Sequence, residues 1–450
     1  MKSIQFLHAA DFQWQVPVMS CATAASGGGL YPPVPEEISR ILREAPWESA
    51  RRVFDVALER KVDFLLLTGD ILEEETCGPR GIAFLTGQME RLREAGIPIY
   101  WKWRETLEWN DWPENVFILP PGETQVRKFR LAEETGTVFL VSWEGEKPDF
   151  ARYDLSKLPG EKLPFSQTLG LRDAPFSEEN AGERVGAYVA LGENEPRQTR
   201  VWENATFHHP GTIQGRTADV FREGSYPTFG VSLVKMDLEG KSPLSIQLIP
   251  TETVAWQRTR LEVPVEIESA EGLAGWLEEQ LALHGKGVAS GVEKILRVWK
   301  LTSQNPTLQT VLRQIFLENL CPMGWNQERV GEVLLNRLRR VGETYSPGIW
   351  SVSLEVEERD LIPAEWSRSE SMLGDFLRLV QFHQNNPDAD GGEDFVSHTL
   401  DLDSFLSKTQ LEEELQVVSR ISEPLVFQEV LRQTAILGAD ALHRLREEES

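Results

Sequence analysis

The chain has 450 residues, of which 40% are hydrophobic and 26% charged, which is the composition of an ordinary globular protein. At about 150 residues per domain, this length predicts three domains. Acidic residues outnumber basic residues by 71 to 46, so the formal net charge is −25. This acidity argues against free-standing, non-specific DNA binding, which needs a face rich in Lys and Arg. It does not exclude nucleic acid that is handled through metal ions or a basic partner.

The three cysteines, Cys21, Cys77 and Cys321, are far apart, and none belongs to a CxxC pair. This usage indicates a reducing compartment without a disulfide framework. No apolar run approaches the roughly 18 residues of a membrane span. The apolar stretch after Met1 is too short for a signal peptide. We therefore expect a cytoplasmic protein with no membrane contact.

The first half of the chain alternates between strand and helix patterns. Residues 4–9 form a short apolar run followed by Asp11, and residues 62–68 form a dense apolar run followed by Asp70. Helical spacing of apolar residues predicts helices over 47–60 and 82–92, the second capped by Gly96. With a strand at 97–101, this order predicts a layered α/β domain. Further strands are expected at 116–119, 126–131, 137–142, 186–191, 229–236 and 244–249, with loop over 145–182.

The second half predicts a small α+β domain followed by helices. A helix begins after Ser269, a plausible N-cap, and helices at 307–319 and 326–341 lie between a strand at 294–302 and one at 349–357. The last of these alternates cleanly, which predicts a half-buried strand. An apolar stripe from Met372 to Val380 and amphipathic patterns over 400–449 predict helices, separated by an acidic linker over 385–394. The expected domains are 1–254, 255–362 and 363–450.

Two aspartates stand at the ends of the first two predicted strands. In layered α/β domains, ligands sit at the C-terminal ends of strands. Asp11 and Asp70 could there supply hard oxygen ligands, one of them bridging two divalent ions. The alternative is a pair of turn or helix-capping aspartates.

Several segments together resemble the calcineurin-like metallophosphoesterases, and more narrowly their SbcD/YhaO-type DNA repair exonuclease branch. The resemblance covers about 1–380 and implies an α/β fold. This fold is a four-layer metallophosphoesterase-like β-sandwich flanked by helices, with a small α+β capping domain and a helical C-terminal segment. The segments are IQFLHAADFQW (4–14), VDFLLLTGDILEE (62–74), YVALGENEPRQ (188–198), HHPGTIQGR (208–216), FGVSLVKMD (229–237), IPTETVAWQRTRLEV (249–263), LRVWKLT (296–302) and WSVSLEVEERD (350–360).

The chain departs from this family at the metal ligands. The family holds its metals with Asp, His, Asp, Asn and three further His, and a Gly-Asn-His-Asp stretch carries the catalytic His. Here Gln13 replaces the first His, and Glu193 and Glu195 replace the Gly-His-x-His pair. After the third strand the chain reads YWKWRET (100–106), with no Gly-Asn-His, and the His expected around 166–171 is absent. The resemblance therefore implies a degenerate member without the His ligands, to which we assign no catalytic residue.

These losses predict impaired chemistry, since removal of a general acid or base typically costs ~10²–10⁴ in rate. Lys102 and Arg104 place positive charge near the expected metal position, where they could contact phosphate or nucleic acid but could not generate hydroxide. A rival interpretation is an all-oxygen site for one Mg²⁺ or Ca²⁺ ion, and its ligands would be Asp11, Asp70, Glu193 and Glu195. The alternative is that the two glutamates are solvated or pair with Lys102 and Arg104. We expect no cofactor unless this site binds one metal. Any cofactor would be a divalent metal, Mg²⁺ or Mn²⁺.

Other candidates have a functional and a structural interpretation. Arg216 could contact phosphate or anchor its loop. His208 and His209 are adjacent, so on an extended segment their side chains point apart and do not share a metal. His8 is expected in the core. Four tryptophans could stack on bases or fill space around a remodelled site, namely Trp101, Trp103, Trp109 and Trp112.

The sequence supports three hypotheses of function. The first is a degenerate exonuclease-like subunit that acts as a scaffold or regulator beside an SbcC-like coiled-coil ATPase and meets DNA only through that complex. The helices at 400–449 could dock on such a coiled coil or pack on their own domain, and a homodimer is a further expectation. The second is an active divalent-metal-dependent phosphodiesterase or nuclease with the carboxylate-rich site. The third is a binding module unrelated to nucleic acid, which the charge of −25 mildly favours.

Overall fold

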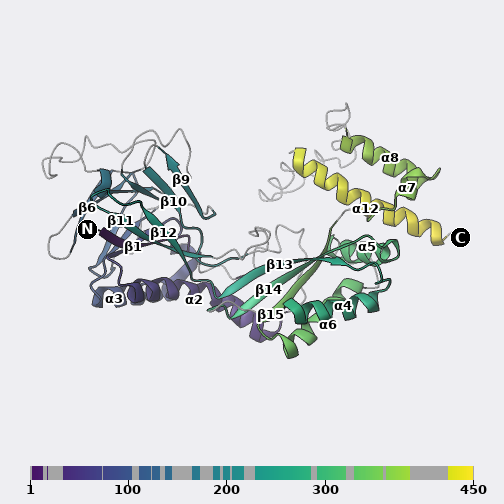
Figure 1. Cartoon of the computed structure of the whole chain (residues 1–450), viewed down its shortest axis with the longest axis horizontal. Coiled ribbons are helices and arrows are strands. Elements are labelled where there is room, and N and C mark those ends of the chain that lie inside the picture. The colour runs from purple at the N-terminus through teal and green to yellow at the C-terminus, as the bar shows by residue number, and fades with distance from the viewer. Residues whose placement is uncertain are drawn as a thin grey trace. The chain divides into compact units, whose positions relative to one another are not determined.

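Figure 1 shows a computed structural model of the chain. The described residues fall into two compact units, of which the first comprises Met1–Arg258, Gly285–Arg297 and Pro347–Trp350, and the second Thr259–His284, Val298–Ser346 and Ser351–Ser450. The predicted domain borders at 254 and 362 remain predictions. The structure describes residues 3–13, 18, 34–72, 74–103, 111–122, 124–131, 137–143, 165–172, 186–192, 196–202, 205–216, 229–284, 291–320, 329–357, 361–385 and 424–448.

The first unit contains two six-stranded sheets. The first sheet has the order β12-β11-β1-β2-β3-β4, and β1 to β4 run parallel while β11 and β12 are antiparallel to their neighbours. The second sheet has the order β5-β6-β7-β8-β10-β9, with antiparallel edge strands. The strands are β1 (Ser3–Ala10), β2 (Phe64–Thr68), β3 (Ile99–Lys102), β4 (Val116–Leu119), β5 (Gln125–Arg130), β6 (Thr137–Ser142), β7 (Thr168–Arg172), β8 (Tyr188–Leu191), β9 (Gln198–Trp202), β10 (Ala205–His209), β11 (Gly230–Asp237) and β12 (Ser245–Pro250).

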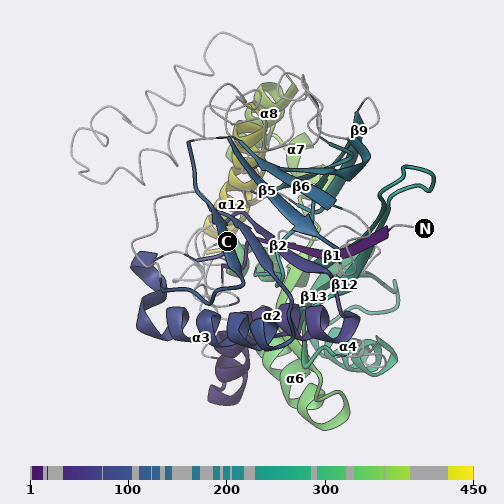
Figure 2. The same cartoon turned by 90° about the vertical axis from the view of Figure 1, so that its left-hand side faces the viewer.

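Alternate residues of the first sheet pack against different layers. Leu7 and Ala9 of β1 face a core shared with helices α2 (Glu36–Arg60) and α3 (Glu74–Glu94), which lie along one face of the sheet (Figure 2). Phe6 and Phe64 face the opposite core, where they meet Tyr188 and other residues of the second sheet. The period-two alternation of strand side chains thus fills both cores. This arrangement confirms the predicted fold class, a β-sandwich flanked by helices.

Local signals placed most of these elements correctly. The six strands expected between 116 and 249 match β4, β5, β6, β8, β11 and β12 to within two residues. Gly96 caps α3 as predicted, with φ of 71° and the N–H of Ile97 bonded to the carbonyl of Leu92. The prediction of a helix start at Trp47 was wrong, because α2 begins at Glu36 and passes through Pro46. Its first turns bury Ile38 and other apolar residues, which offsets the loss of one backbone hydrogen bond at proline.

The prediction of loop over 145–182 was wrong at β7, which is buried between β6 and β8. Gly170 lies in this strand, where a Cβ atom would come within 2.8 Å of the Trp143 ring. The strand therefore depends on close contact with distant residues rather than on a local apolar pattern. Strands β9 and β10 were also missed, for the same reason.

The small α+β region contains the sheet β13-β14-β15, formed by β13 (Val254–Val263), β14 (Lys294–Ser303) and β15 (Ile349–Val356). Its helices are α4 (Ala270–His284), α5 (Pro306–Leu320) and α6 (Val330–Tyr345). Ser269 caps α4 as predicted, because its Oγ accepts the N–H of Gly272 at 3.2 Å. The predicted polar face of β15 is not fully exposed, since Ser351 is buried and accepts a hydrogen bond from Trp299.

The C-terminal helices α7 (Ala364–Arg368), α8 (Met372–Asn385) and α12 (Pro424–Glu448) belong to the second unit. Helix α12 packs on α8 and α5. The predicted stripe on α8 is correct for Leu373, Leu377 and Val380, which are buried, but wrong for Met372, which is 74% exposed. The rest of the predicted linker and helices, residues 386–423, lies outside the described residues. No helix among the described residues has the length and apolarity needed to cross a membrane.

Candidate functional site

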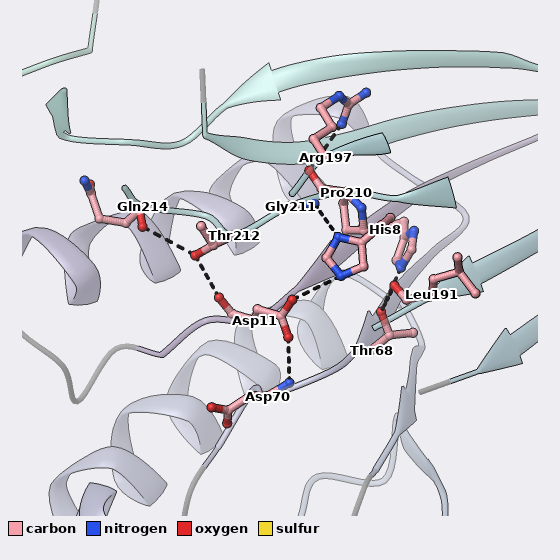
Figure 3. Close-up of polar contacts among 11 residues, drawn as sticks. His8, Asp11, Thr68, Asp70, Leu191, Arg197, Pro210, Gly211, Thr212 and Gln214 are labelled. Atoms are coloured by element: carbon pink, nitrogen blue, oxygen red, sulfur yellow. Dashed lines mark hydrogen bonds and ion pairs between the residues drawn. The ribbon is translucent and has the colours of Figure 1, made fainter. Parts of the chain in front are cut away.

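The carboxyl ends of β1 and β2 bring Asp11 and Asp70 together (Figure 3). These strands are parallel neighbours, with Ala10 paired to Thr68, so the residues that follow them meet at one edge of the sheet. The Asp11 carboxylate is 1% exposed, and its Oδ1 accepts the backbone N–H of Asp70 at 2.9 Å. The N–H of Phe12 donates in return to the carbonyl of Asp70 at 2.7 Å.

His209 completes this corner from the second sheet. It is the last residue of β10, and its Nε2 lies 3.2 Å from Oδ2 of Asp11, with both side chains withdrawn from solvent. Its Nδ1 accepts the backbone N–H of Gly211 at 3.0 Å, which places the ring proton on Nε2. Within the described part of the chain, neither Nε2 nor Oδ2 makes an aligned hydrogen bond. The contact is therefore electrostatic, between an imidazole N–H and a carboxylate.

His8 is a buried core residue, as predicted. Its Nδ1 lies 2.7 Å from the Tyr188 hydroxyl, and its Nε2 lies 2.9 Å from Oγ1 of Thr68. Because the Thr68 hydroxyl donates to the carbonyl of Leu191, His8 donates to Thr68 from Nε2 and accepts from Tyr188 at Nδ1. Burial lowers the pKa of His8 well below its usual value, and nearby His208 lowers it further. His8 is thus neutral.

The side chains of His208 and His209 have different partners and point apart, as the sequence predicts for neighbours on an extended segment. The ring of His208 lies 2.7 Å from Oγ1 of Thr199 and 2.7 Å from Oγ of Ser232. Burial, and then the charge of Arg197, lower the pKa of His208 to about 3. The side chain of His208 therefore serves as a neutral hydrogen-bonding bridge between β9 and β11.

Arg216 and Lys102 are both buried, and the structure shows contacts of each with backbone carbonyls. The Arg216 guanidinium donates to the carbonyls of Phe12 and Gln13, which are the contacts of a loop anchor. Lys102 ends β3, with Nζ 3.5 Å from the carbonyl of Pro120. The other predicted contact residue, Arg104, and the two glutamates, Glu193 and Glu195, lie outside the described residues.

The described residues do not fit a two-metal centre. Within the described ranges, no group of three or more His, Cys, Asp or Glu residues is placed to hold a metal ion. Both oxygens of Asp11 already face protein N–H groups, and the Nδ1 lone pair of His209 accepts the Gly211 N–H. We therefore derive no step through a metal. The predicted four-carboxylate site stays a prediction, because two of its ligands are not described.

Tryptophans fill the end of β3, where the resemblance leads one to expect Asn and His. Trp101 and Trp103 are buried in the core shared with α2 and α3. Their ring centroids are 4.5 Å apart, and Trp112 lies 5.4 Å from Trp101. These three residues pack as core side chains, and Trp109 lies outside the described residues.

The chain is similar to YhaO of Bacillus subtilis (strain 168), an uncharacterized metallophosphoesterase. The two are 25% identical over 336 residues, which covers 70% of this chain and 78% of YhaO. This similarity supports the metallophosphoesterase family. No family model matches the sequence. In a metallophosphoesterase-like chain, the corner formed by Asp11, Asp70 and His209 is the candidate functional site.

Two solved structures show a distant likeness. One is a predicted phosphoesterase from Streptococcus pneumoniae TIGR4, 12% identical, covering 56% of this chain and 91% of that protein with a TM-score of 0.25. The other is an archaeal phosphodiesterase, 8% identical, covering 55% of this chain and all of that protein with a TM-score of 0.23. At these scores the likeness supports no further conclusion.

Sequence reasoning missed the role of two residues at this corner. His209 was considered only together with His208, and a metal shared by the two was rejected, although the following Pro210-Gly211 is a signal that a strand ends there. Arg197 was not singled out at all. Its contacts join the second sheet to Ser232 of the first, and no local pattern indicates such a long-range placement.

Proposed function

We propose that this chain is a metallophosphoesterase-like subunit in which metal-dependent hydrolysis is impaired, and that it acts as a scaffold or regulator. One observation carries the proposal, namely the contact between the Asp11 carboxylate and the Nε2–H of His209. A bridging carboxylate in a two-metal site directs its oxygens at the ions. In this chain the imidazole N–H of His209 faces Oδ2 of Asp11 instead.

The surroundings of this contact support the proposal. Trp101 and Trp103 form apolar core at the neighbouring strand end, so that strand offers no ligand in those two positions. Reversal of the His209 ring tautomer would free Nε2 but would leave the Gly211 N–H opposite a protonated Nδ1. Such an unsatisfied buried donor costs about 1–3 kcal/mol. The corner thus favours the arrangement without a metal.

The proposal is tested by hydrolysis and by metal content. Purified full-length protein is incubated with Mn²⁺ or Mg²⁺, its bound metal is measured by elemental analysis, and turnover of bis-(p-nitrophenyl) phosphate and of a linear DNA is followed. We expect the wild-type rate to equal that of the Asp70→Ala variant. Turnover that requires a bound metal and disappears in Asp70→Ala would contradict the proposal.

The alternative function is an active phosphodiesterase or nuclease with a carboxylate-rich site. It is favoured by the close approach of Asp11 and Asp70, which brings two oxygen-bearing residues to one strand edge. This alternative requires that Glu193→Ala abolish a metal-dependent activity. The Glu193→Gln variant keeps the size of the side chain and removes only its charge, so comparison with Glu193→Ala separates the two effects.

We propose an SbcC-like coiled-coil ATPase as the partner, with DNA reached only through the complex. The resemblance supports this partner, and the charge of −25 explains why contact with DNA would need a basic companion. Co-expression with such an ATPase from the same genome should give a complex that survives size-exclusion chromatography. Separate elution of the two proteins, with unchanged ATPase activity, would contradict a scaffold or regulator role in that complex.

A further inference from the structure

Arg197 occupies an unusual position beside the candidate site. It directly precedes β9, and its Nη1 donates to Oγ of Ser232 at 2.5 Å and to the carbonyl of Pro210 at 3.4 Å. Ser232 belongs to β11 of the first sheet, while Pro210 follows β10 of the second. The guanidinium therefore joins the two sheets. Figure 3 shows its contact with Pro210, the residue that follows His209 in the sequence. This is the strand edge at which α/β domains bind ligands.

The cation of Arg197 has no carboxylate partner among the described residues. Its hydrogen bonds to described residues go to neutral oxygens, and both are donated by Nη1. Nε and Nη2 donate to no described residue, and neither belongs to the buried polar atoms that lack a partner, so both donors keep some exposure to solvent. A half-buried charge without a counter-charge is costly, because desolvation is not repaid by an ion pair. The burial lowers the pKa of Arg197, as expected for an uncompensated cation.

The neighbouring groups hold Arg197 in place without neutralising it. His208 bridges Ser232 and Thr199, and its own protonation is suppressed. Gly211 has φ of 79°, and a Cβ atom there would come within 3.1 Å of the Arg197 backbone nitrogen. The absence of a side chain at Gly211 thus allows the close approach. Contacts with residues distant in the sequence therefore fix the position of Arg197.

We propose that Arg197 forms a metal-independent subsite for a phosphate-type oxyanion. Two donors of a planar guanidinium match two oxygens of a phosphate group, and such bidentate pairs are among the stronger charge-assisted hydrogen bonds. The ligand class is inorganic phosphate or a terminal phosphomonoester. This subsite deepens the proposed function, since a scaffold that has lost its metals keeps a means of recognising a phosphate.

The test is isothermal titration of the full chain in buffer containing EDTA, with inorganic phosphate as the first probe. A 5′-phosphorylated oligonucleotide and the same oligonucleotide without phosphate distinguish a free anion from a strand terminus. We expect saturable binding of phosphate, of the phosphorylated oligonucleotide, or of both. The Arg197→Gln variant should weaken it at least tenfold, roughly the value of one charged hydrogen bond. Arg200→Gln is the matched control, because Arg200 is exposed on β9, and it should bind as the wild type does.

Binding by Arg197→Gln equal to that of the wild type would overturn the proposal, as would the lack of any saturable binding. Cooperative thermal melting establishes whether the variant folds. If Arg197→Gln does not fold, Arg197→Lys decides, because it keeps the charge but lacks the planar fork. Weaker binding by Arg197→Lys supports the subsite, and unchanged binding contradicts it. Because no metal is present, this result is independent of the hydrolysis test above.

Discussion

Nε2 of His209 lies 3.2 Å from Oδ2 of Asp11, so the last residue of β10 in one sheet faces the first turn after β1 in the other. The contact links the two sheets at the edge where the candidate site lies. The Gly211 N–H also selects the tautomer of His209, because Nδ1 accepts it and the ring proton then lies on Nε2, toward the carboxylate. The same two side chains thus connect the sheets and carry the proposal of impaired hydrolysis.

Removal of the imidazole should destabilise the first unit. We expect His209→Ala to lower the free energy of unfolding by about 1–3 kcal/mol, because Oδ2 of Asp11 would stay buried without a facing donor. Urea denaturation measures the loss. The exposed His284, at the end of α4, provides the control variant His284→Ala. A double-mutant cycle with Asp11→Asn should show coupling, and strictly additive effects would contradict the pairing.

Acid should weaken the fold through His8 and His208. In the folded state the pKa of His208 is lowered to about 3, whereas the unfolded value is about 6.5. The unfolded chain therefore takes up a proton that the folded chain refuses as the pH falls. The contribution to stability is complete above about pH 6.5 and is lost toward pH 3, at ~1.4 kcal/mol per pH unit for each such histidine.

Unfolding free energies are measured between pH 7.5 and pH 4.5, since about pH 6.5 to pH 3 is the range in which the folded and unfolded states of His208 differ in protonation. As the pH falls, the free energy of unfolding should decrease more steeply for the wild type than for His208→Gln. The difference between the two proteins isolates this histidine from the many carboxylates that titrate in the same range. Parallel pH profiles would contradict the assignment.

Glu252 should have the opposite pH dependence. Its side chain is buried, Oε2 has no hydrogen-bond partner among the described residues, and burial raises its pKa to about 8. A carboxyl with a raised folded pKa stabilises fully below its unfolded value of about 4.5, and this stability is lost as the pH rises through 8. Glu252→Gln should therefore stabilise the protein at pH 9, by roughly 2–4 kcal/mol.

The comparison uses chemical denaturation at pH 5 and pH 9. At the lower pH the variant and the wild type should nearly coincide, because the native side chain is then protonated. A variant that is less stable than the wild type at the higher pH would show that the ionised carboxylate has a partner after all.

The second unit contains a buried ion pair between α5 and α12. Arg313 and Asp440 approach to 3.3 Å, and the Arg313 guanidinium also lies over the Trp366 ring. Asp440→Asn should lower stability by about 3 kcal/mol, because one charge would remain buried without its partner. The exposed pair Arg378–Asp375 serves as the control, since breaking such a pair changes stability by about 0.5 kcal/mol. Equal effects on the thermal transition would contradict this difference.

The sequence predicted the framework of the site because its signals are local. The dense apolar run before Asp70 and the shorter run before Asp11 define two buried strands, and parallel pairing then brings their carboxyl ends together. The α/β order follows from the alternation of strand and helix patterns. Asp11 and Asp70 were therefore placed correctly relative to each other without any long-range information.

The remaining contacts could not be predicted because they join distant segments. Strand β10 is short and is stabilised by β8 and β9 on either side, so its local pattern is weak. The direction of His209 depends on that pairing, and the position of Arg197 depends on Ser232 across the two sheets. A composition-based loop assignment likewise hid β7, whose Gly170 accommodates Trp143.

Arg216 holds the turn after β1, where Asp11 and Gln13 adopt left-handed backbone angles with φ of 50° and 43°. Such angles are strained in residues other than glycine and persist only where surrounding groups enforce them. Since the guanidinium bonds the carbonyls of this turn, groups of the protein itself hold its shape. An incoming ligand would meet a preorganised surface and would not have to order the backbone on arrival.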